Sequence, residues 1–285
     1  MNTLAFKIGW RLALYPALLC AALSFAMFWT YAHPRRFTGE HAPSDFGLKA
    51  EALKLKTSDG VTLDAWFIPN AASRKAVIVC HGYPMDKSDV LGNTAFLARR
   101  FNLLYFDFRG TGRSGGFFST GGAKEVLDLD AAAAFLRERG FREIGVFGFS
   151  MGGGTALLSR NPAIKARALE APFADLSGEL DYIFSFIGPL RRPLLGMMKL
   201  WARLLAGADI NAVSPVKNTA AFTAPLLLIH GDRDGTVPLS NSLAIKAADP
   251  AAELWIVKGA DHGQCHYKAP AEYEKRLSGF FKAHL

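Results

Sequence analysis

Short, continuous apolar runs, separated by helical patterns, constrain the fold of this chain more than any other feature of its sequence. The runs are KAVIVC (75–80), NLLYFDF (102–108), EIGVFGF (143–149), ARALEA (166–171), PLLLIH (225–230) and AELWIV (252–257). Continuous runs of this length are typical of parallel strands that are buried on both faces. Helical patterns lie between most of them or after the last, over 88–100, 123–139, 239–248 and 271–283. The alternation predicts an α/β fold, with a mostly parallel, doubly wound sheet and helices on both faces.

Residues 175–217 interrupt this alternation, because they carry no strand pattern. We expect an inserted, mainly helical cap there. Upstream, EALKLKT and VTLDAWFI flank Ser58-Asp59-Gly60 and predict a two-stranded hairpin. The chain has 285 residues, 50% of them hydrophobic, which suits one large α/β domain with an insertion. Its 3 cysteines are too few, and odd in number, for a disulfide framework.

The N-terminal segment contains an uncharged stretch from Leu12 to Ala32 that is long enough to cross a bilayer. Trp10, Trp29 and Tyr31 lie near its ends, where interfacial aromatic residues are expected. A cleaved signal peptide is the alternative, but the following TYAHPRRF offers no convincing cleavage site. We therefore expect one transmembrane helix in a membrane anchor at residues 1–33, a tether at 34–50 and the α/β domain at 51–285. Basic residues occur on both flanks, and the short basic N-terminal segment favours an extracytoplasmic domain.

The formal net charge of +8 raises the question of a nucleic-acid partner. None is expected, because the basic residues are scattered and no nucleic-acid-binding motif is present. A local excess lies in the cap, where Arg191, Arg192, Lys199 and Arg203 occur without an acid between residues 190 and 208. This excess suits an anionic membrane surface. No Cys/His spacing is typical of a zinc site, and we expect neither a metal nor a cofactor.

The cap also contains an amphipathic segment, Pro193–Leu205, which favours a helix with a proline at its start. Lys199 and Arg203 are four residues apart and share one face, while apolar residues cover most of the remainder. Two interpretations stay open. The segment is either an ordinary lid helix with solvated bases, or a lid that lies at the bilayer with its apolar side over an acyl pocket.

The segment VFGFSMGGGT places Ser150 at the end of an apolar run, with Gly148 before it and Gly152 after it. A serine beside a turn often only caps the next helix. The functional interpretation is a nucleophile elbow, in which the serine occupies a strained turn between a strand and a helix. The run EIGVFGF predicts the strand, and MGGGTALLSR predicts a short helix that ends before Asn161-Pro162. The local context therefore favours the elbow.

A serine nucleophile needs a base within hydrogen-bond reach and an acid that orients the base. Reactive groups in open α/β sheets gather at the carboxyl ends of the strands. This rule selects His262 after the last run, with His266 as the nearest alternative, and it leaves Asp232 and Asp234 both open as the acid. His81 and His230 precede glycines at strand ends, which favours structural hydrogen bonds for both.

Taken together, these motifs resemble those of the α/β-hydrolase family, from about Leu53 to the end of the chain. The resemblance rests on HGYP, DFRGTGRSGG, GFSMGG, HGDRDGTVP and GADH, in that order. It implies Ser150 as the nucleophile, His262 as the base and Asp234 as the acid. The expected chain order of serine, acid and histidine agrees with the elbow.

The same resemblance implies an oxyanion hole formed by the backbone N–H groups of Tyr83 and Met151, which would stabilise charge that develops in the transition state. Several polar residues have structural interpretations. Asp107, Arg109 and Ser114 are expected to tie together the loop after the second run, and Glu170 and Asp175 rank below Asp234 as acids.

The N-terminal anchor and the segment YFDFRGTGRSGG resemble, more loosely, the membrane-anchored hydrolases of the fission-yeast bud-emergence-like type. We expect a serine hydrolase that cleaves a carboxylic ester or thioester of an acyl or lipid-like substrate through an acyl-enzyme intermediate. Two alternatives are a serine peptidase that uses the same triad and a non-catalytic, membrane-tethered binding module. Aspartate-dependent dehalogenase or epoxide-hydrolase chemistry is disfavoured, because the elbow carries a serine.

Overall fold

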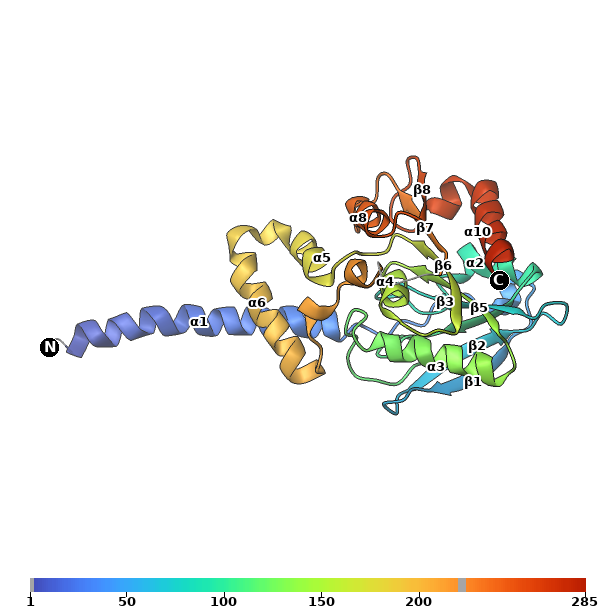
Figure 1. Ribbon diagram of the computed structural model, residues 1–285. Coiled ribbons are helices and arrows are strands. Elements are labelled where there is room, and N and C mark those ends of the chain that lie inside the picture. The colour runs from blue at the N-terminus through green and yellow to red at the C-terminus, as the bar shows by residue number, and fades with distance from the viewer. Residues whose placement is uncertain (1–2, 220–223) are drawn as a thin grey trace.

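A computed structural model describes residues 3–219 and 224–285 (Figure 1). Within them, one 8-stranded sheet has the order β1-β2-β4-β3-β5-β6-β7-β8. The strands are β1 (Glu51–Lys56), β2 (Thr62–Ile68), β3 (Lys75–Cys80), β4 (Asn102–Phe106), β5 (Glu143–Phe149), β6 (Ile164–Glu170), β7 (Leu226–Gly231) and β8 (Glu253–Val257). The β1–β2 and β2–β4 pairs are antiparallel, and every later pair is parallel. Each predicted apolar run is a strand, and the predicted fold class is confirmed.

Helices cover both faces of the sheet, because side chains of a strand alternate between its two faces. In β3, Ala76, Ile78 and Cys80 pack in one apolar core, while Val77 and Val79 pack in the other. The first core includes residues of α3 (Glu125–Glu138), α4 (Met151–Leu158) and α8 (Ser240–Ala248). The second includes residues of α2 (Leu91–Thr94), the 3₁₀ turn η2 (Ala95–Arg99), α9 (Cys265–Lys268) and α10 (Pro270–His284). The sheet is therefore sandwiched between two helical layers.

The segment between β6 and β7 forms a helical cap at one end of the sheet. Its elements are α5 (Leu176–Ile183), η3 (Ser185–Leu190), α6 (Arg191–Trp201), η4 (Ala202–Ala206), η5 (Ile210–Ala212) and α7 (Pro215–Thr219). The Asp175 side chain caps α5 by accepting a hydrogen bond from the Gly178 N–H. Gly207, with φ of 61°, ends the α6–η4 unit in the left-handed region that glycine tolerates.

Helix α1 (Thr3–Ala32) projects from the body of the molecule, and only its C-terminal part packs against the cap (Figure 1). Phe28 and Ala32 share a third apolar cluster with Leu195 and Met198 of α6. The Trp201 indole N–H donates a 3.1 Å hydrogen bond to the Ser24 hydroxyl. By length and composition, Trp10–Ala32 is a candidate membrane span, the kind of segment that an anchor or a signal sequence provides.

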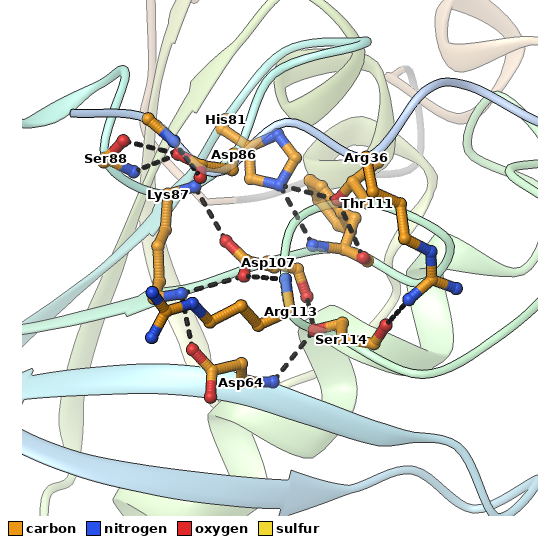
Figure 2. Close-up of polar contacts among 12 residues, drawn as sticks. Arg36, Asp64, His81, Asp86, Lys87, Ser88, Asp107, Thr111, Arg113 and Ser114 are labelled. Atoms are coloured by element: carbon orange, nitrogen blue, oxygen red, sulfur yellow. Dashed lines mark hydrogen bonds and ion pairs between the residues drawn. The ribbon is translucent and has the colours of Figure 1, made fainter.

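Residues 34–50, the expected tether, lie along the loops that follow β3 and β4. The Arg36 guanidinium donates to the carbonyl oxygens of Ser114 (2.6 Å) and Gly116 (2.5 Å). The Gly39 N–H donates to Asp86 at 2.7 Å. Figure 2 shows the first of these contacts beside the buried polar groups of the β3 and β4 loops. The segment that follows α1 is thus bound to the domain at several points.

Two predicted helices differ from the observed ones. The pattern over 88–100 becomes the short α2 followed by a 3₁₀ turn, because the last part of the segment tightens into i→i+3 bonding. The predicted cap helix Pro193–Leu205 instead starts at Arg191, so that the proline lies inside the first turn. It continues beyond Trp201 as a π-helical turn.

Candidate active site

Ser150 occupies the turn between β5 and α4 with a strained backbone. Its φ of 51° and ψ of −114° lie outside the regions that residues with a side chain prefer. The Ser150 N–H donates a 2.8 Å hydrogen bond to the Glu170 carbonyl oxygen of β6, and the Ser150 carbonyl accepts from the Gly154 N–H. Strain that is held in place by such contacts is typical of functional sites. This strained turn between a strand and a helix is the local geometry that the sequence predicts for an elbow.

The glycines around Ser150 are required by close backbone contacts. A Cβ on Gly148 would lie 2.6 Å from the Gly152 carbonyl oxygen. A Cβ on Gly152 would lie 2.5 Å from the Cys80 carbonyl oxygen at the end of β3. Both distances are shorter than real Cβ contacts allow, so any larger residue would push the turn apart. The elbow is therefore packed directly against the end of β3.

His262 and Asp234 form a hydrogen-bonded pair beside the elbow. The two residues lie in the loops after β8 and β7, and His262 Nδ1 is 2.7 Å from Asp234 Oδ2. The imidazole contacts the ring of Phe149, the residue before Ser150, with centroids 4.8 Å apart. In the described residues no hydrogen bond joins the Ser150 hydroxyl to His262. Such contacts are often long in the absence of substrate and tighten when it binds.

Asp234 is buried, with a side chain only 1% exposed, and it accepts several hydrogen bonds. Its Oδ1 accepts from the N–H groups of Thr236 and Val237, at 2.9 and 2.8 Å. Burial raises the pKa of Asp234, but hydrogen bonds from His230 and His262 outweigh that effect and hold it below its ordinary value. An ionised carboxylate can only accept, so His262 Nδ1 donates and Nε2 is left free to accept a proton.

His230 is the second partner of Asp234. The sequence predicted only a structural role for this histidine. Its ring is fully buried, and Nε2 lies 3.4 Å from Asp234 Oδ2 and 2.8 Å from the Val237 carbonyl oxygen. Nδ1 is 2.7 Å from the Ser242 hydroxyl of α8. These contacts fix the Asp234 loop to β7 and α8.

The other candidate residues lie elsewhere or have other partners. Asp232 accepts from the Gly259 N–H and makes no bond to His262, while Asp175 caps α5. Glu170 accepts a 2.7 Å hydrogen bond from the Tyr273 hydroxyl, and burial raises its pKa. His266 stacks on Phe96, away from the pair.

Tyr83 and Met151, the expected oxyanion-hole residues, lie on adjacent segments. Met151 is the first residue of α4, where backbone N–H groups have no partner within the helix. Tyr83 follows β3, and the approach of Gly152 to Cys80 brings this loop against the elbow. His81 supports the loop, since its Nε2 accepts from the Phe108 N–H at 3.0 Å.

A largely buried polar network connects the loops that follow β3 and β4 (Figure 2). Lys87 Nζ lies 2.6 Å from Asp64 Oδ2 and 2.8 Å from Asp107 Oδ2. The Ser114 hydroxyl donates to the Asp107 carbonyl oxygen, and Arg109 pairs with Asp59 and Asp128. These contacts link the β3 and β4 loops to the strand β2, in agreement with the structural role expected for Asp107, Arg109 and Ser114.

A largely apolar cavity opens at Ser150. It is lined by Tyr83 and Met151, by Thr236 and Val237 of the Asp234 loop, and by the cap residues Leu180, Ile183 and Met198. Phe28, Tyr31 and Ala32 of α1 complete its wall. Among the described residues that line it, Glu179 is the only acid. No sequence pattern predicted this role for the α1 residues or for Glu179, because only the fold of the cap brings them to the cavity.

Several known proteins are similar to this chain over most of its length. The model of the prolyl oligopeptidase family matches residues 89–285. The Mycobacterium tuberculosis protein Rv2307c is 31% identical over 222 residues, 73% of this chain and 70% of that protein. Protein bem46 of Schizosaccharomyces pombe is 25% identical over 207 residues, 69% of this chain and 64% of that protein.

Among solved structures, the Pyrococcus furiosus esterase Pf2001 is similar to this chain with a TM-score of 0.75 and 29% sequence identity. The similarity covers 90% of this chain and 98% of the esterase chain. The resemblance to bud-emergence-like α/β hydrolases is confirmed by these matches. The chain is thus a hydrolase with the α/β-hydrolase fold, and it belongs to the prolyl oligopeptidase family.

Proposed function

We propose that the protein is a serine hydrolase that cleaves carboxylic esters or thioesters of medium or long acyl chains at a membrane surface. The observation that supports this most strongly is the position of Ser150 at the mouth of a largely apolar cavity, beside a hydrogen-bonded His262–Asp234 pair. Apolar walls suit a hydrocarbon chain, and the pair supplies the base that a serine nucleophile needs.

In the proposed reaction, His262 Nε2 takes the proton of the Ser150 hydroxyl as the serine oxygen attacks the acyl carbon. Asp234 keeps the imidazole in the required tautomer and stabilises the imidazolium. The N–H groups of Tyr83 and Met151 donate to the oxyanion. The imidazolium then protonates the leaving alcohol or thiol, and a water activated by His262 releases the acid from Ser150 by the same steps in reverse order.

Amide hydrolysis is the second candidate, because the matching family model is that of the prolyl oligopeptidases. The walls of the cavity favour the ester, since a peptide substrate would bring backbone N–H and C=O groups against apolar side chains of the cap and α1. The structural neighbour Pf2001 is named as an esterase. The experiment is a series of p-nitrophenyl esters from acetyl to dodecanoyl, beside the matched p-nitroanilides. Turnover should rise with chain length, and faster turnover of an anilide than of its ester would favour the peptidase.

The geometry of α1 supports a membrane location that includes the cap. A bilayer core about 30 Å thick needs about 20 helical residues. The uncharged part of α1 that precedes the cap contacts, residues 12–23, is only about 18 Å long. If α1 spans the bilayer, residues 24–32 also lie in the bilayer. The α6 residues that pack on this part of α1 then lie at the membrane surface.

The outer surface of the cap suits this placement. Phe186 is 81% exposed, and Leu190, Leu200 and Leu204 are also exposed beside Arg192 and Arg203. Such a mixture of apolar and basic side chains is typical of surfaces that insert into an anionic interface. Two of the four bases between residues 190 and 208 have protein partners instead: Arg191 pairs with Asp181, and Lys199 donates to Ser177 and Asn211.

We therefore propose that α1 is an uncleaved anchor and that the cap dips into the outer leaflet, with the domain on the extracytoplasmic side. Alkaline carbonate washing should leave the full-length protein in the membrane fraction, and protease added to spheroplasts should reach the domain. Release by carbonate would contradict the anchor, and protection from protease would reverse the side.

A further inference from the structure

The cavity beside Ser150 contains one buried carboxyl group that the proposed reaction does not use. Glu179 belongs to α5 and lines the cavity, and the residue is only 7% exposed. Its Oε1 is buried and has no hydrogen-bond partner. Buried acceptors without partners are uncommon because they cost free energy in the folded protein, so each one suggests a role for a ligand.

The helix that carries Glu179 lies beside the loop that holds Asp234. Thr236 and Val237, which hold Asp234 by their N–H groups, line the same cavity. Burial and the charge of Asp234 raise the pKa of the Glu179 carboxyl, while the charge of His262 and the Asn241 side chain lower it in part, and the resulting pKa is about 7. The Tyr182 hydroxyl of the same helix donates a 3.2 Å hydrogen bond to the Gly235 carbonyl oxygen, so α5 lies against the loop of Asp234, the partner of His262. In a serine hydrolase that imidazole delivers its proton to the departing alcohol. The apolar residues of α1 and α6 line another part of the cavity wall, which suits the acyl chain.

We propose that Glu179 is a specificity residue that accepts a hydrogen bond from a donor group on the alcohol part of the substrate, which we identify as a free hydroxyl of a polyol monoester such as an acylglycerol. This proposal rests on the proposed ester hydrolysis. A site built to hydrogen-bond a substrate group rejects analogues that lack it, because its own buried polar atom is then left without a partner. An apolar residue at position 179 would favour a plain alkyl ester instead.

An ammonium group is a second source of the same donor chemistry, since Glu179 would accept from it in the charged form. The three substrates 1-monododecanoylglycerol, propyl dodecanoate and 3-aminopropyl dodecanoate share one acyl chain and a three-carbon alcohol. They differ only in the donor groups of that alcohol. The quantity measured is kcat/KM for each ester, using the full-length protein in mixed micelles of constant composition.

Three variants accompany the wild type. Glu179→Leu removes the acceptor, and Glu179→Gln keeps an acceptor oxygen and the side-chain size but removes the charge. Asp181→Asn is the matched control, because Asp181 lies on the same helix but pairs with Arg191 outside the cavity lining. Labelling of Ser150 by a fluorophosphonate reports, for each variant, that the site is assembled.

The wild type and Asp181→Asn should prefer the glycerol ester to the propyl ester by about tenfold or more, the effect of one buried hydrogen bond. Glu179→Leu should reduce that ratio to near one, and Glu179→Gln should retain part of it. A preference for the aminopropyl ester that Glu179→Gln abolishes would support the donor site and identify ammonium as the source. An unchanged ratio in a Glu179→Leu protein that labels normally would overturn the proposal while leaving ester hydrolysis intact. A wild type that neither labels nor turns over any ester would overturn the proposed function itself.

Discussion

The Tyr83 hydroxyl donates a 2.7 Å hydrogen bond to the carbonyl oxygen of Tyr31. Tyr31 belongs to the last turn of α1, and Tyr83 belongs to the loop expected to provide an oxyanion donor. Together with the packing of Phe28 on the cap, this contact makes the end of α1 part of the cavity wall rather than a passive anchor. The candidate membrane segment and the candidate site are therefore coupled.

This coupling predicts different effects for two truncations of α1. Removal of residues 1–23 retains Ser24, Phe28 and Ala32, and should leave kcat/KM for a soluble butyrate ester within about twofold of the full-length value. Removal of residues 1–33 deletes the wall and exposes the cluster around Met198, so both thermal stability and the preference for long acyl chains should fall. Chain-length profiles of both proteins in detergent provide the measurement. Identical profiles would show that α1 has no part in the cavity.

The proposed triad predicts losses of activity that do not add. Ser150→Ala, His262→Ala and Asp234→Asn should each lower kcat for a p-nitrophenyl ester by about 10³-fold or more, and combining them should cost little further, because the three residues act as a unit. Asp232→Asn, on the same loop but bonded to Gly259, is the matched control and should retain activity. Loss in Asp232→Asn with retention in Asp234→Asn would reverse the choice of acid.

The exposed bases of the cap predict a charge-dependent contact with membranes. Arg192→Glu combined with Arg203→Glu should weaken binding of the protein lacking residues 1–23 to vesicles that contain anionic lipid, and should spare hydrolysis of a soluble ester. The control is Lys275→Glu with Lys282→Glu, an equal change of charge on α10, which lies away from α1 and the cap (Figure 1). Vesicle flotation measures the binding. Equal binding by both double variants would favour an ordinary lid.

The raised pKa of Glu179 predicts a pH dependence of stability. The group has an ordinary pKa of 4.5 and a pKa of about 7 in the folded protein, where burial disfavours its charge. The folded protein thus holds this proton more tightly than the unfolded chain, so its contribution to stability is lost as pH rises from about 4.5 to about 7. Glu179→Gln lacks the titration, and its melting temperature should fall less over that range than the wild-type value. Parallel melting curves at every pH would contradict the raised pKa.

The sequence predicted the sheet because each buried strand is a continuous apolar run, and burial on both faces leaves little choice of side chain. It predicted the elbow for a similar reason, since the close backbone contacts of Gly148 and Gly152 exclude larger residues. The pairing of His262 with Asp234 followed from the family pattern and from the rule that strand ends converge at one edge.

The residues that form the wall of the cavity could not be predicted from the sequence. An apolar helix such as α1 has the same composition whether it faces lipid or Met198 of the cap, so pattern alone did not reveal its second role. In the sequence, Glu179 has the pattern of an ordinary polar position of an amphipathic helix. Its burial results only from the packing of α5 over the site. Likewise, the basic run of the cap did not show that Lys199 bonds to Ser177 and Asn211.

A fluorophosphonate probe, followed by mass spectrometry of the labelled peptide, tests whether Ser150 is an activated nucleophile. The probe should modify Ser150 in the full-length wild type. Labelling should fall strongly in His262→Ala and Asp234→Asn, and should stay at the wild-type level in Asp232→Asn. A folded wild-type protein that remains unlabelled, or that is labelled at another serine, would contradict the role of Ser150 as the nucleophile.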